Sequence, residues 1–109
     1  MDKHEALGLL NQRLSVLEQL PYSELVKRVR TNEAIQVIGQ SGTEYNVEIT
    51  VVWNGMRENE EIRVIGSIDD GHFWSAFRPG MAGFVMSPSG LVTSRRRGEK
   101  DEDTDDRKA

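Results

Sequence analysis

The chain has 109 residues, of which 37% are hydrophobic, and it contains no cysteine. This length allows one small domain with a single hydrophobic core, and the lack of cysteine excludes disulfides and thiolate chemistry. No apolar run approaches the roughly 20 residues of a membrane-spanning helix, and the first residues do not resemble a secretory signal, so we expect a soluble, cytoplasmic protein.

The distribution of charge argues against a nucleic-acid partner. The net charge is −4; residues 1–94 carry eight basic and twelve acidic side chains, and residues 95–109 carry six of each. A protein that binds by neutralising phosphates usually presents a basic face, whereas the folded part of this chain is acidic. We therefore expect neither a nucleic acid nor a membrane as its partner.

Residues 2–30 have the periodicity of helices. The apolar side chains of the first helix span an arc of roughly 180°, wider than the ~100° stripe that one packing surface needs. Pro21 ends this helix or starts a short second one. Two arrangements would explain the wide arc. The helix contacts both the protein's own sheet and a second chain, or it packs more deeply into the protein's own core. The apolar residues of the first helix are Ala6, Leu7, Leu9, Leu10, Leu14, Val16, Leu17 and Leu20.

Residues 33–53 predict a β-hairpin. In "TEYNVEITVVW", apolar and polar residues alternate, as in a strand with one buried face. Pairing Ile35 with Val47 and Val37 with Tyr45 keeps the apolar side chains of both strands on one face. That register leaves residues 40–42 as a three-residue loop, with Gly42 at the left-handed position.

Residues 62–78 predict a second hairpin, because Asp70-Gly71 is a strong signal for a two-residue type I′ turn. In that register Ile68 pairs with Phe73 and Val64 pairs with Phe77, and both pairs lie on the core face. The outward face then carries Arg63, Ile65, Ser67, Asp69, His72, Trp74, Ala76 and Arg78.

These elements predict an α+β domain over residues 1–94. An N-terminal helix, broken near Pro21, packs on an antiparallel meander sheet of about five strands. Turn signals at residues 79–80 and 87–90 flank the short strand "FVM", and "LVT" follows as the last strand. Residues 95–109, "RRRGEKDEDTDDRKA", have no large apolar side chain and predict a disordered charged tail.

The stretch "SIDDGHFWSAFRPG" at residues 67–80 gathers groups that could serve a metal or an acid–base site. The predicted register places Asp69 opposite His72, where they form a modest cross-strand pair. A metal needs three or four convergent ligands, and an acid–base pair needs a pocket and a third group. The sequence supplies neither, so we expect no metal, no cofactor and no catalytic residue.

The outward face of this hairpin has the composition of a protein interface. Trp74 lies beside Ile65 there, and Arg63 faces Arg78, which is typical of interaction hot spots. In the alternatives, Trp74 is covered by residues 54–61 or by the tail, or it stacks on an arginine of its own chain. The predicted interaction surface consists of Trp74, Arg63, Arg78, Ile65, His72 and Asp69.

Four segments together, "LPYSELVKRV", "SGTEYNVEITVVW", "RVIGSIDDG" and "MSPSG", resemble a group of small bacterial proteins of unknown function. In that group a helical segment precedes antiparallel strands with an Asp-Asp-Gly turn and a late Pro-x-Gly turn. The resemblance spans roughly residues 20–92. It implies a stand-alone domain and carries over no activity and no functional residue.

Two functions from different classes follow from this organisation. The first is a non-enzymatic cytosolic interaction module that self-associates, for instance as a dimer, or binds a protein partner through the outer sheet face or the first helix. The alternative is a small-molecule binding or catalytic domain with a pocket between helix and sheet. A cavity at Tyr45, Thr50 or Ser75 favours the alternative. An inner face filled by Phe73, Phe77, Val64 and the leucines favours the module.

Overall fold

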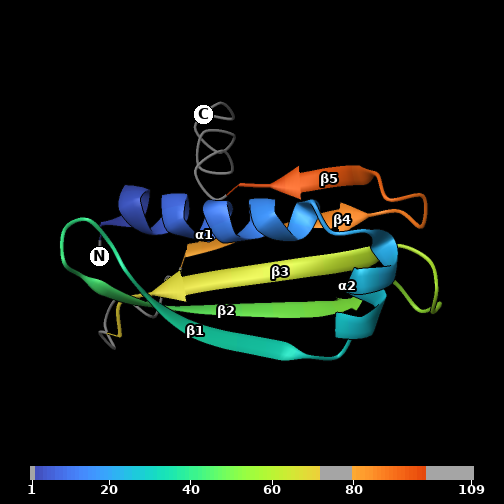
Figure 1. The fold of residues 1–109 in the computed structure, drawn as a ribbon, viewed down its shortest axis with the longest axis horizontal. Coiled ribbons are helices and arrows are strands. Elements are labelled where there is room, and N and C mark those ends of the chain that lie inside the picture. Colours follow the sequence, from blue (N-terminus) through green and yellow to red (C-terminus); the bar gives the residue numbers. More distant parts are fainter. Residues whose placement is uncertain (1, 72–79, 98–109) are drawn as a thin grey trace, which may run out of the picture.

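The computed structural model describes residues 2–71 and 80–97. Two helices precede one antiparallel sheet (Figure 1). The strands lie in the order β1-β2-β3-β4-β5, so each strand pairs with its neighbour in the sequence. The predicted helix-on-meander α+β fold is therefore confirmed. The elements are α1 (Lys3–Glu18), α2 (Tyr22–Arg28), β1 (Asn32–Ile38), β2 (Glu44–Trp53), β3 (Ile62–Asp69), β4 (Gly80–Met86) and β5 (Val92–Arg96).

The two helices begin differently, α1 after a capping side chain and α2 after a proline that makes no capping hydrogen bond. Asp2 is the N-cap of α1, and its side chain accepts a hydrogen bond of 3.0 Å from the backbone N–H of Glu5. Pro21 is the N-cap of α2, so the predicted break near this residue is confirmed. Lys27 and Arg28 occupy the last turn of α2, where positive charge suits the helix dipole.

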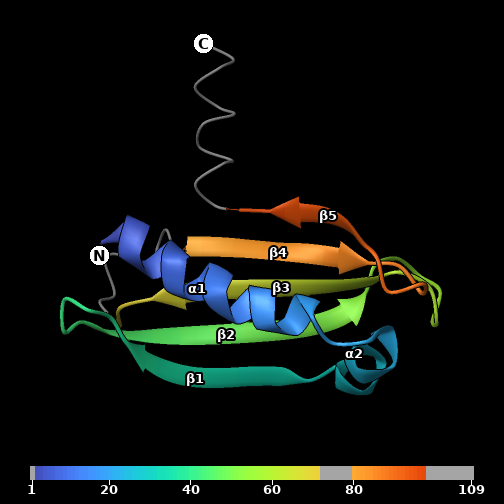
Figure 2. The ribbon, with the colours of Figure 1, turned by 45° about the horizontal axis from the view of Figure 1, so that its top comes forward.

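Helix α1 crosses one face of the sheet obliquely and packs mainly on β3 and β4 (Figure 2). Glycines bring the two layers close together. A Cβ at Gly66 would lie 2.8 Å from Cδ1 of Leu10, and a Cβ at Gly80 would lie 3.0 Å from Cδ2 of Leu7. The helix therefore docks where the sheet has no side chain in its way.

The core lies between α1 and the inner face of the sheet. Leu9 and Leu20 also pack against it, whereas Val16 is 55% exposed. The wide apolar arc of α1 thus wraps largely into the protein's own core, and Val16 is its exposed part. The largest fully buried side chains are Tyr45, Leu7, Leu10, Leu14, Leu25, Ile62, Ile68, Met86, Val47 and Val64.

The β1–β2 hairpin has the predicted register. Ile35 pairs with Val47 and Val37 pairs with Tyr45. Gly42 adopts φ +89°, the left-handed conformation expected of it in the three-residue loop.

The predicted register of the second hairpin is wrong. Strand β3 pairs with residues 80–86, so Val64 lies opposite Phe84 and Ile68 lies opposite Gly80. Both registers keep apolar residues inward. The observed one places Gly80 and Ala82 beneath α1, where Phe73 and Phe77 would require a wider gap between the layers.

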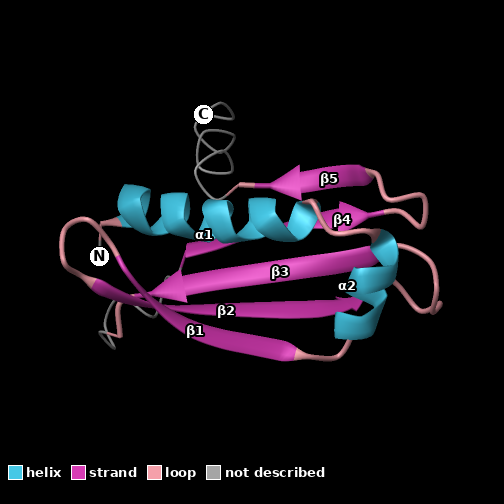
Figure 3. Ribbon diagram, viewed as in Figure 1, coloured by secondary structure: helices cyan, strands magenta, loops and turns pink. Residues whose placement is uncertain are grey.

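The chain remains paired for two residues beyond the expected domain end at 94. Strand β5 reaches Arg96 and, as Figure 3 shows, forms one edge of the sheet. Arg95 lies on the helix side, where its guanidinium donates to both carboxylate oxygens of Glu18 at 3.0–3.1 Å. This contact ties the last strand to the end of α1.

Candidate interaction surface

The outer sheet face, defined as the face opposite α1, is organised by the strand registers. One row of side chains runs through Thr50, Ile65, Gly83 and Arg96. The row on one side of it contains Val52, Arg63, Val85 and Ser94. The row on the other side contains Glu48, Ser67 and Met81.

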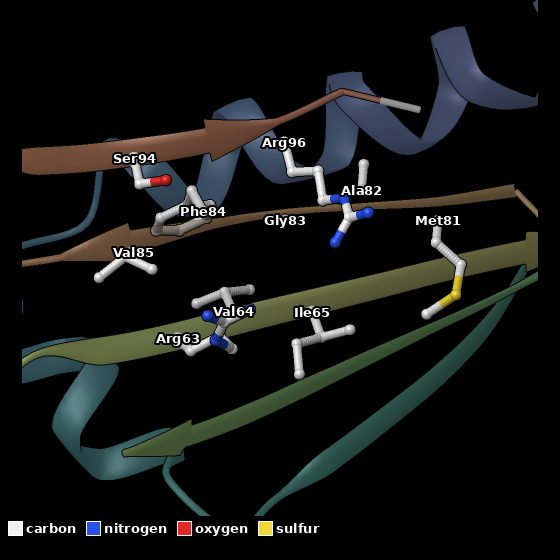
Figure 4. A pocket seen from close by; sticks show the side chains of 10 residues that line it. All are labelled: Arg63, Val64, Ile65, Met81, Ala82, Gly83, Phe84, Val85, Ser94 and Arg96. Atoms are coloured by element: carbon white, nitrogen blue, oxygen red, sulfur yellow. The ribbon is translucent and has the colours of Figure 1, made fainter. Parts of the chain in front are cut away.

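A groove of about 480 Å³ lies on this face over β3, β4 and β5 (Figure 4). Its floor is open at Gly83, where a Cβ would stand only 2.4 Å from the carbonyl oxygen of Val64. Glycine is therefore required for β3 and β4 to approach this closely, and it leaves the middle of the groove free of a side chain. The outward side chains that line the groove are those of Arg63, Ile65, Met81, Val85, Ser94 and Arg96.

The groove combines apolar and cationic groups. Met81 is 50% exposed and Ile65 is half-buried, and they project from adjacent strands. Arg63 is exposed, and its Nε donates 3.0 Å to Oδ1 of Asn54, which restrains the side chain. Arg96 extends from β5 over β4 in Figure 4. Arg63 lies one row from Ile65, whereas Arg96 lies in the same row as Ile65 and Gly83, so the two cations border the apolar side chains from different strands.

The other end of this face is acidic and amide-rich. Asp69 accepts hydrogen bonds from Nδ2 of Asn46 at 3.2 Å and from the backbone N–H of Gly71 at 2.8 Å. Its carboxylate thus fixes the turn that follows β3. Glu48 is exposed on β2, opposite Ser67 of β3. Asp69 and Glu48 thus place two carboxylates at this end, and Glu61, which accepts a hydrogen bond of 3.1 Å from Nδ2 of Asn54, places another beside Arg63 at the opposite end.

Half of the predicted interaction surface lies among the described residues. Arg63, Ile65 and Asp69 all point outward from β3; the first two line the groove and Asp69 lies at the acidic end. The remaining predicted residues, His72, Trp74 and Arg78, lie outside the described residues.

The sequence analysis missed the contribution of β4 and β5 to this surface. The predicted surface lacks Met81, Gly83 and Val85 because the predicted register pairs β3 with the wrong segment, and it lacks Arg96 because that residue is predicted to lie in the tail. The available signal was the glycine in "GMAGFVM", because a glycine inside a strand often marks a close approach or an open site.

A separate polar cluster joins α1 to the β1–β2 loop. The carboxylate of Glu5 accepts hydrogen bonds from the hydroxyls of Tyr45 and Ser41, both at 2.7 Å, and from the backbone N–H of Ser41 at 3.0 Å. These bonds, with Tyr45 first, lower the pKa of Glu5. Burial, and then the bond to Glu5, raise the pKa of Tyr45 to about 12.

This cluster is better suited to holding the fold together than to catalysis. A general base works best with a pKa near the working pH, and the lowered pKa of Glu5 moves it away from that range. The donors from Tyr45 and Ser41 all converge on this one carboxylate. Glu5 therefore acts as a clasp between the loop and the helix.

A second depression, of about 460 Å³, lies where both helices meet β1 and β2. Leu17, Ile49 and Val51 contribute apolar surface. Two charged residues at its rim are already paired within the chain: Glu24 with Lys27 at 3.1 Å, and Glu33 with Arg13. Two of its carboxylates are thus engaged with neighbouring cations.

The inner face does not open at the positions that would favour a ligand. Tyr45 has no exposed surface, and Val64 and the leucines of α1 are buried in the same core. Thr50 points to the outer face instead, opposite Ile65. Ser75, Phe73 and Phe77 lie outside the described residues.

Within residues 2–71 and 80–97, no three side chains of His, Cys, Asp or Glu are grouped closely enough to hold a metal ion. Neither α1 nor α2, the helices of that part of the chain, has the length and apolar character of a membrane span. No protein-family model matches the chain, and no curated protein or solved structure shows significant similarity to it. The resemblance to small bacterial proteins stays a prediction.

Proposed function

We propose that this protein is a non-enzymatic interaction module that docks a protein partner on its outer sheet face. The observation that carries this proposal is the groove over Gly83, with exposed Met81 and half-buried Ile65 beside Arg63 and Arg96. Methionine and arginine are enriched at protein interfaces, and apolar centres with polar rims are typical of them. A cytoplasmic location is part of the proposal, since the chain uses no cysteine that an oxidising compartment could pair.

The physical basis is the cost of leaving this surface in water. Burying apolar surface against a partner lowers the free energy by about 25 cal/mol per Å². Gly83 carries no side chain, so the groove between the side chains of Ile65, Met81 and Val85 is not filled at that position. Arg63 is held by Asn54, so ordering it against a partner loses less entropy than ordering an unrestrained arginine.

The ligand-pocket alternative has less support from the described residues. The inner face is filled around Tyr45. In the depression beside α2, Glu24 and Glu33 already pair with cations of the same chain, whereas a small-molecule site needs polar groups that converge on the ligand.

The test compares two single substitutions at apolar residues of similar exposure. Met81→Asp places a charge in the groove, and Val16→Asp places one on the exposed side of α1. Each chain, with the wild type, serves as a tagged bait in lysate of the source cell that also contains an untagged copy. Bound proteins are identified and quantified by mass spectrometry.

We expect a stoichiometric partner, either the untagged copy or another protein, to bind the wild type and Val16→Asp and to be lost with Met81→Asp. Circular dichroism melts of the three chains establish that the baits are folded. A partner lost only with Val16→Asp would assign the contact to α1 instead. Binding that is equal for all three baits, or absent for all, would overturn the proposal.

A further inference from the structure

We propose that β1 pairs along its outer edge with β1 of a second copy of this chain, antiparallel, about a two-fold axis at Ile35. The contact lies at the edge of the sheet, so it is separate from the outer-face groove and goes beyond the proposed function. Three features of β1 support it: the direction of its main-chain groups, the side chains beside them, and the difference between the two sheet edges.

The main-chain groups of β1 point alternately toward β2 and away from it. The backbone N–H of Gly39 donates a hydrogen bond of 2.9 Å to the carbonyl oxygen of Thr43, and at the other end of β1 the N–H of Val51 donates one of 3.5 Å to the carbonyl oxygen of Thr31. Because hydrogen-bonded pairs alternate along an antiparallel ladder, the odd-numbered residues between these two bonds face β2. The N–H and C=O groups of the even-numbered residues therefore point to the outer edge. These residues are Asn32, Ala34, Gln36 and Ile38.

An antiparallel pairing centred on Ile35 gives every one of these groups a partner. Ala34 then lies opposite Gln36 of the second copy, and Asn32 lies opposite Ile38. Four N–H donors on each strand make eight hydrogen bonds across the contact. A shift of two residues in either direction places Asn32 or Ile38 opposite a residue outside β1. The strand is thus complementary to itself over its whole length in one register.

The same pairing covers apolar side chains that the protein's own helix leaves open. A two-fold axis perpendicular to the sheet places α1 of both copies on the same face. Helix α1 packs mainly on β3 and β4, so Ile35 and Val37 of β1 are only half-buried at the margin of the core. In the dimer Ile35 lies beside Ile35 of the second copy, which extends the apolar layer from one chain to the other.

The charge on β1 is compatible with this register. Glu33 is the charged residue of the strand, and its carboxylate is paired with Arg13 of the same chain. It comes opposite Val37 of the second copy. The two Glu33 residues are therefore four positions apart along the strands, about 14 Å. Like charges destabilise a strand pair when they lie directly opposite, and here they do not.

The neighbouring carboxylates also stay apart. Glu44 and Glu48 lie on β2, and two β1 strands separate them from β2 of the second copy, which amounts to about 14 Å. The carboxylate of Glu5 covers Gly39, and Gly39 comes opposite Thr31, two positions from the neutral Glu33–Arg13 pair.

The two edges of the sheet differ in the features that prevent strand addition (Figure 2). Strand β5 carries Arg95 and Arg96, and its pairing with β4 contains a register shift. Charged side chains and bulges are common means of keeping an edge from pairing. Strand β1 has a regular register over its seven residues, contains neither proline nor lysine, and ends at Ile38, which is 67% exposed. Among the described residues, β1 pairs with β2 alone.

The rival occupants are the chain's own C-terminal segment and a strand of another protein. Residues 98–109 include the run "DEDTDD", and acidic residues are depleted in strands. A strand of another protein would have to match this edge by chance, whereas a second copy matches it in register, length and charge. The observations therefore favour the second copy.

The contact is small, because it adds one strand pair. Its buried area falls at or below the low end of specific interfaces, which is about 1,200 Å² in total. We therefore expect a reversible dimer that forms only in concentrated solution. An association of this strength is not populated at the dilution of a lysate capture, so the outer-face test is independent of it.

The first experiment is sedimentation equilibrium of the full chain over a micromolar to millimolar range. Gln36→Pro removes a main-chain N–H that points to the outer edge, so it leaves the bonds between β1 and β2 in place and should weaken dimerisation at least tenfold. Gln36→Ala, the matched control, removes the side chain and keeps the N–H, so it should dimerise within about twofold of the wild type. Circular dichroism melts of dilute samples establish that each variant is folded.

The second experiment tests the register and does not depend on the proline variant. The chain has no cysteine, so Ile35→Cys carries one thiol per copy. In the proposed pairing residue 35 lies opposite itself in a non-hydrogen-bonded pair, with the Cα atoms about 4.5 Å apart, which suits a disulfide. Mild oxidation of a concentrated sample should therefore produce a covalent dimer. Val37→Cys, on the same face, lies opposite Glu33 and should remain monomeric.

The outcomes separate the two proposals. A wild-type chain that stays monomeric, and whose Ile35→Cys variant does not crosslink, overturns the edge dimer; Met81-dependent capture of another protein would still support the outer face. An edge dimer without such capture supports this contact and ends the outer-face proposal. A dimer that is kept by Gln36→Pro, or that crosslinks through Val37→Cys in place of Ile35→Cys, uses another contact and overturns the inference. A dimer that appears only after truncation at Arg97 would assign the edge to residues 98–109, and capture of another protein that Gln36→Pro abolishes in a monomeric chain would assign it to that protein; both results overturn the second copy.

Discussion

The phenolic hydroxyl of Tyr45 donates a 2.7 Å hydrogen bond to the carboxylate of Glu5, a residue 40 positions earlier in the chain. Tyr45 belongs to β2 and is fully buried, whereas Glu5 belongs to the first turn of α1. Ser41 of the intervening loop adds two bonds to the same carboxylate. One carboxylate thus joins three parts of the fold, and its ionisation should be visible in the stability of the whole domain.

Glu5→Gln should reduce the loss of stability in acid. The folded protein lowers the pKa of Glu5 below its ordinary value of 4.5, so this group stabilises the fold above that value and ceases to do so as the pH falls through the folded pKa. Urea midpoints measured from about pH 7 down to about pH 3 should fall more steeply for the wild type than for the variant. Parallel curves would mean that the hydrogen bonds from Tyr45 and Ser41 to Glu5 do not form in solution.

Tyr45→Phe should reduce the loss of stability at alkaline pH. The folded protein raises the pKa of Tyr45 from 10.0 to about 12, so its contribution is complete below pH 10 and is lost as the pH rises toward 12. We expect the variant to be about 1 kcal/mol less stable at neutral pH, because one hydrogen bond is removed. Its stability should also change less than that of the wild type across the alkaline window. The measurement is again the urea midpoint, at matched pH values.

Leu14→Ala should cost about 2–5 kcal/mol of unfolding free energy, since Leu14 is 1% exposed and its removal leaves a cavity under α1. Val16→Ala, two residues away in the same helix, should change the stability by no more than about 0.5 kcal/mol, because Val16 is largely exposed. Chemical denaturation of both variants checks the pair. Equal costs would mean that the helix is rotated relative to the sheet.

Three glycine-to-alanine substitutions should give three different results. Gly83→Ala should cost about 1–3 kcal/mol, because the new Cβ meets the backbone of Val64, which cannot move without disturbing the sheet. Gly66→Ala should cost less, since the new Cβ meets the flexible end of Leu10. Gly8→Ala, in open space on α1, should stabilise the protein by about 0.5–1 kcal/mol. Thermal melts establish the order, and a Gly83→Ala variant as stable as the wild type would contradict the close approach of β3 and β4.

The Arg95–Glu18 pair should show a small, salt-sensitive coupling. The contact is bidentate, but the Arg95 side chain is 48% exposed, so a double-mutant cycle of Arg95→Ala and Glu18→Ala should give about 0.2–1 kcal/mol. The coupling should shrink when the cycle is repeated in about 1 M salt. A coupling that is zero at low salt would show that β5 is not fastened to α1 in solution.

Local patterns were sufficient to predict much of this fold. The alternation in β2 and the loop length after β1 fixed the pairing of Ile35 with Val47, because a shift of one residue would turn every apolar side chain of β1 outward. The leucine spacing of α1 identified the buried face, with Leu14 at its centre. Both inferences depend only on neighbours in the sequence.

The β3–β4 pairing could not be predicted in the same way, because two registers both keep alternating apolar residues inward. The packing of α1 selects between the two registers, because the helix needs the small residues Gly80 and Ala82 beneath it. The helix and these residues are about 75 positions apart in the sequence, so local patterns do not reveal the contact. The same error concealed Met81 and Val85 as neighbours of Arg63 and Ile65. The predicted surface therefore included the β3 part of the groove and missed the part supplied by β4 and β5.

The order of the elements has a consequence for how the protein acquires its fold. Within the described residues every strand pairs with its neighbour in the sequence, so the sheet forms through contacts of short sequence separation, which favour fast folding. Helix α1 comes first in the chain but packs on β3 and β4, so its leucines have no complete docking site until β4 has been synthesised. During translation the nascent helix keeps its apolar face exposed while most of the sheet is made, which makes the docking of α1 a late step of folding.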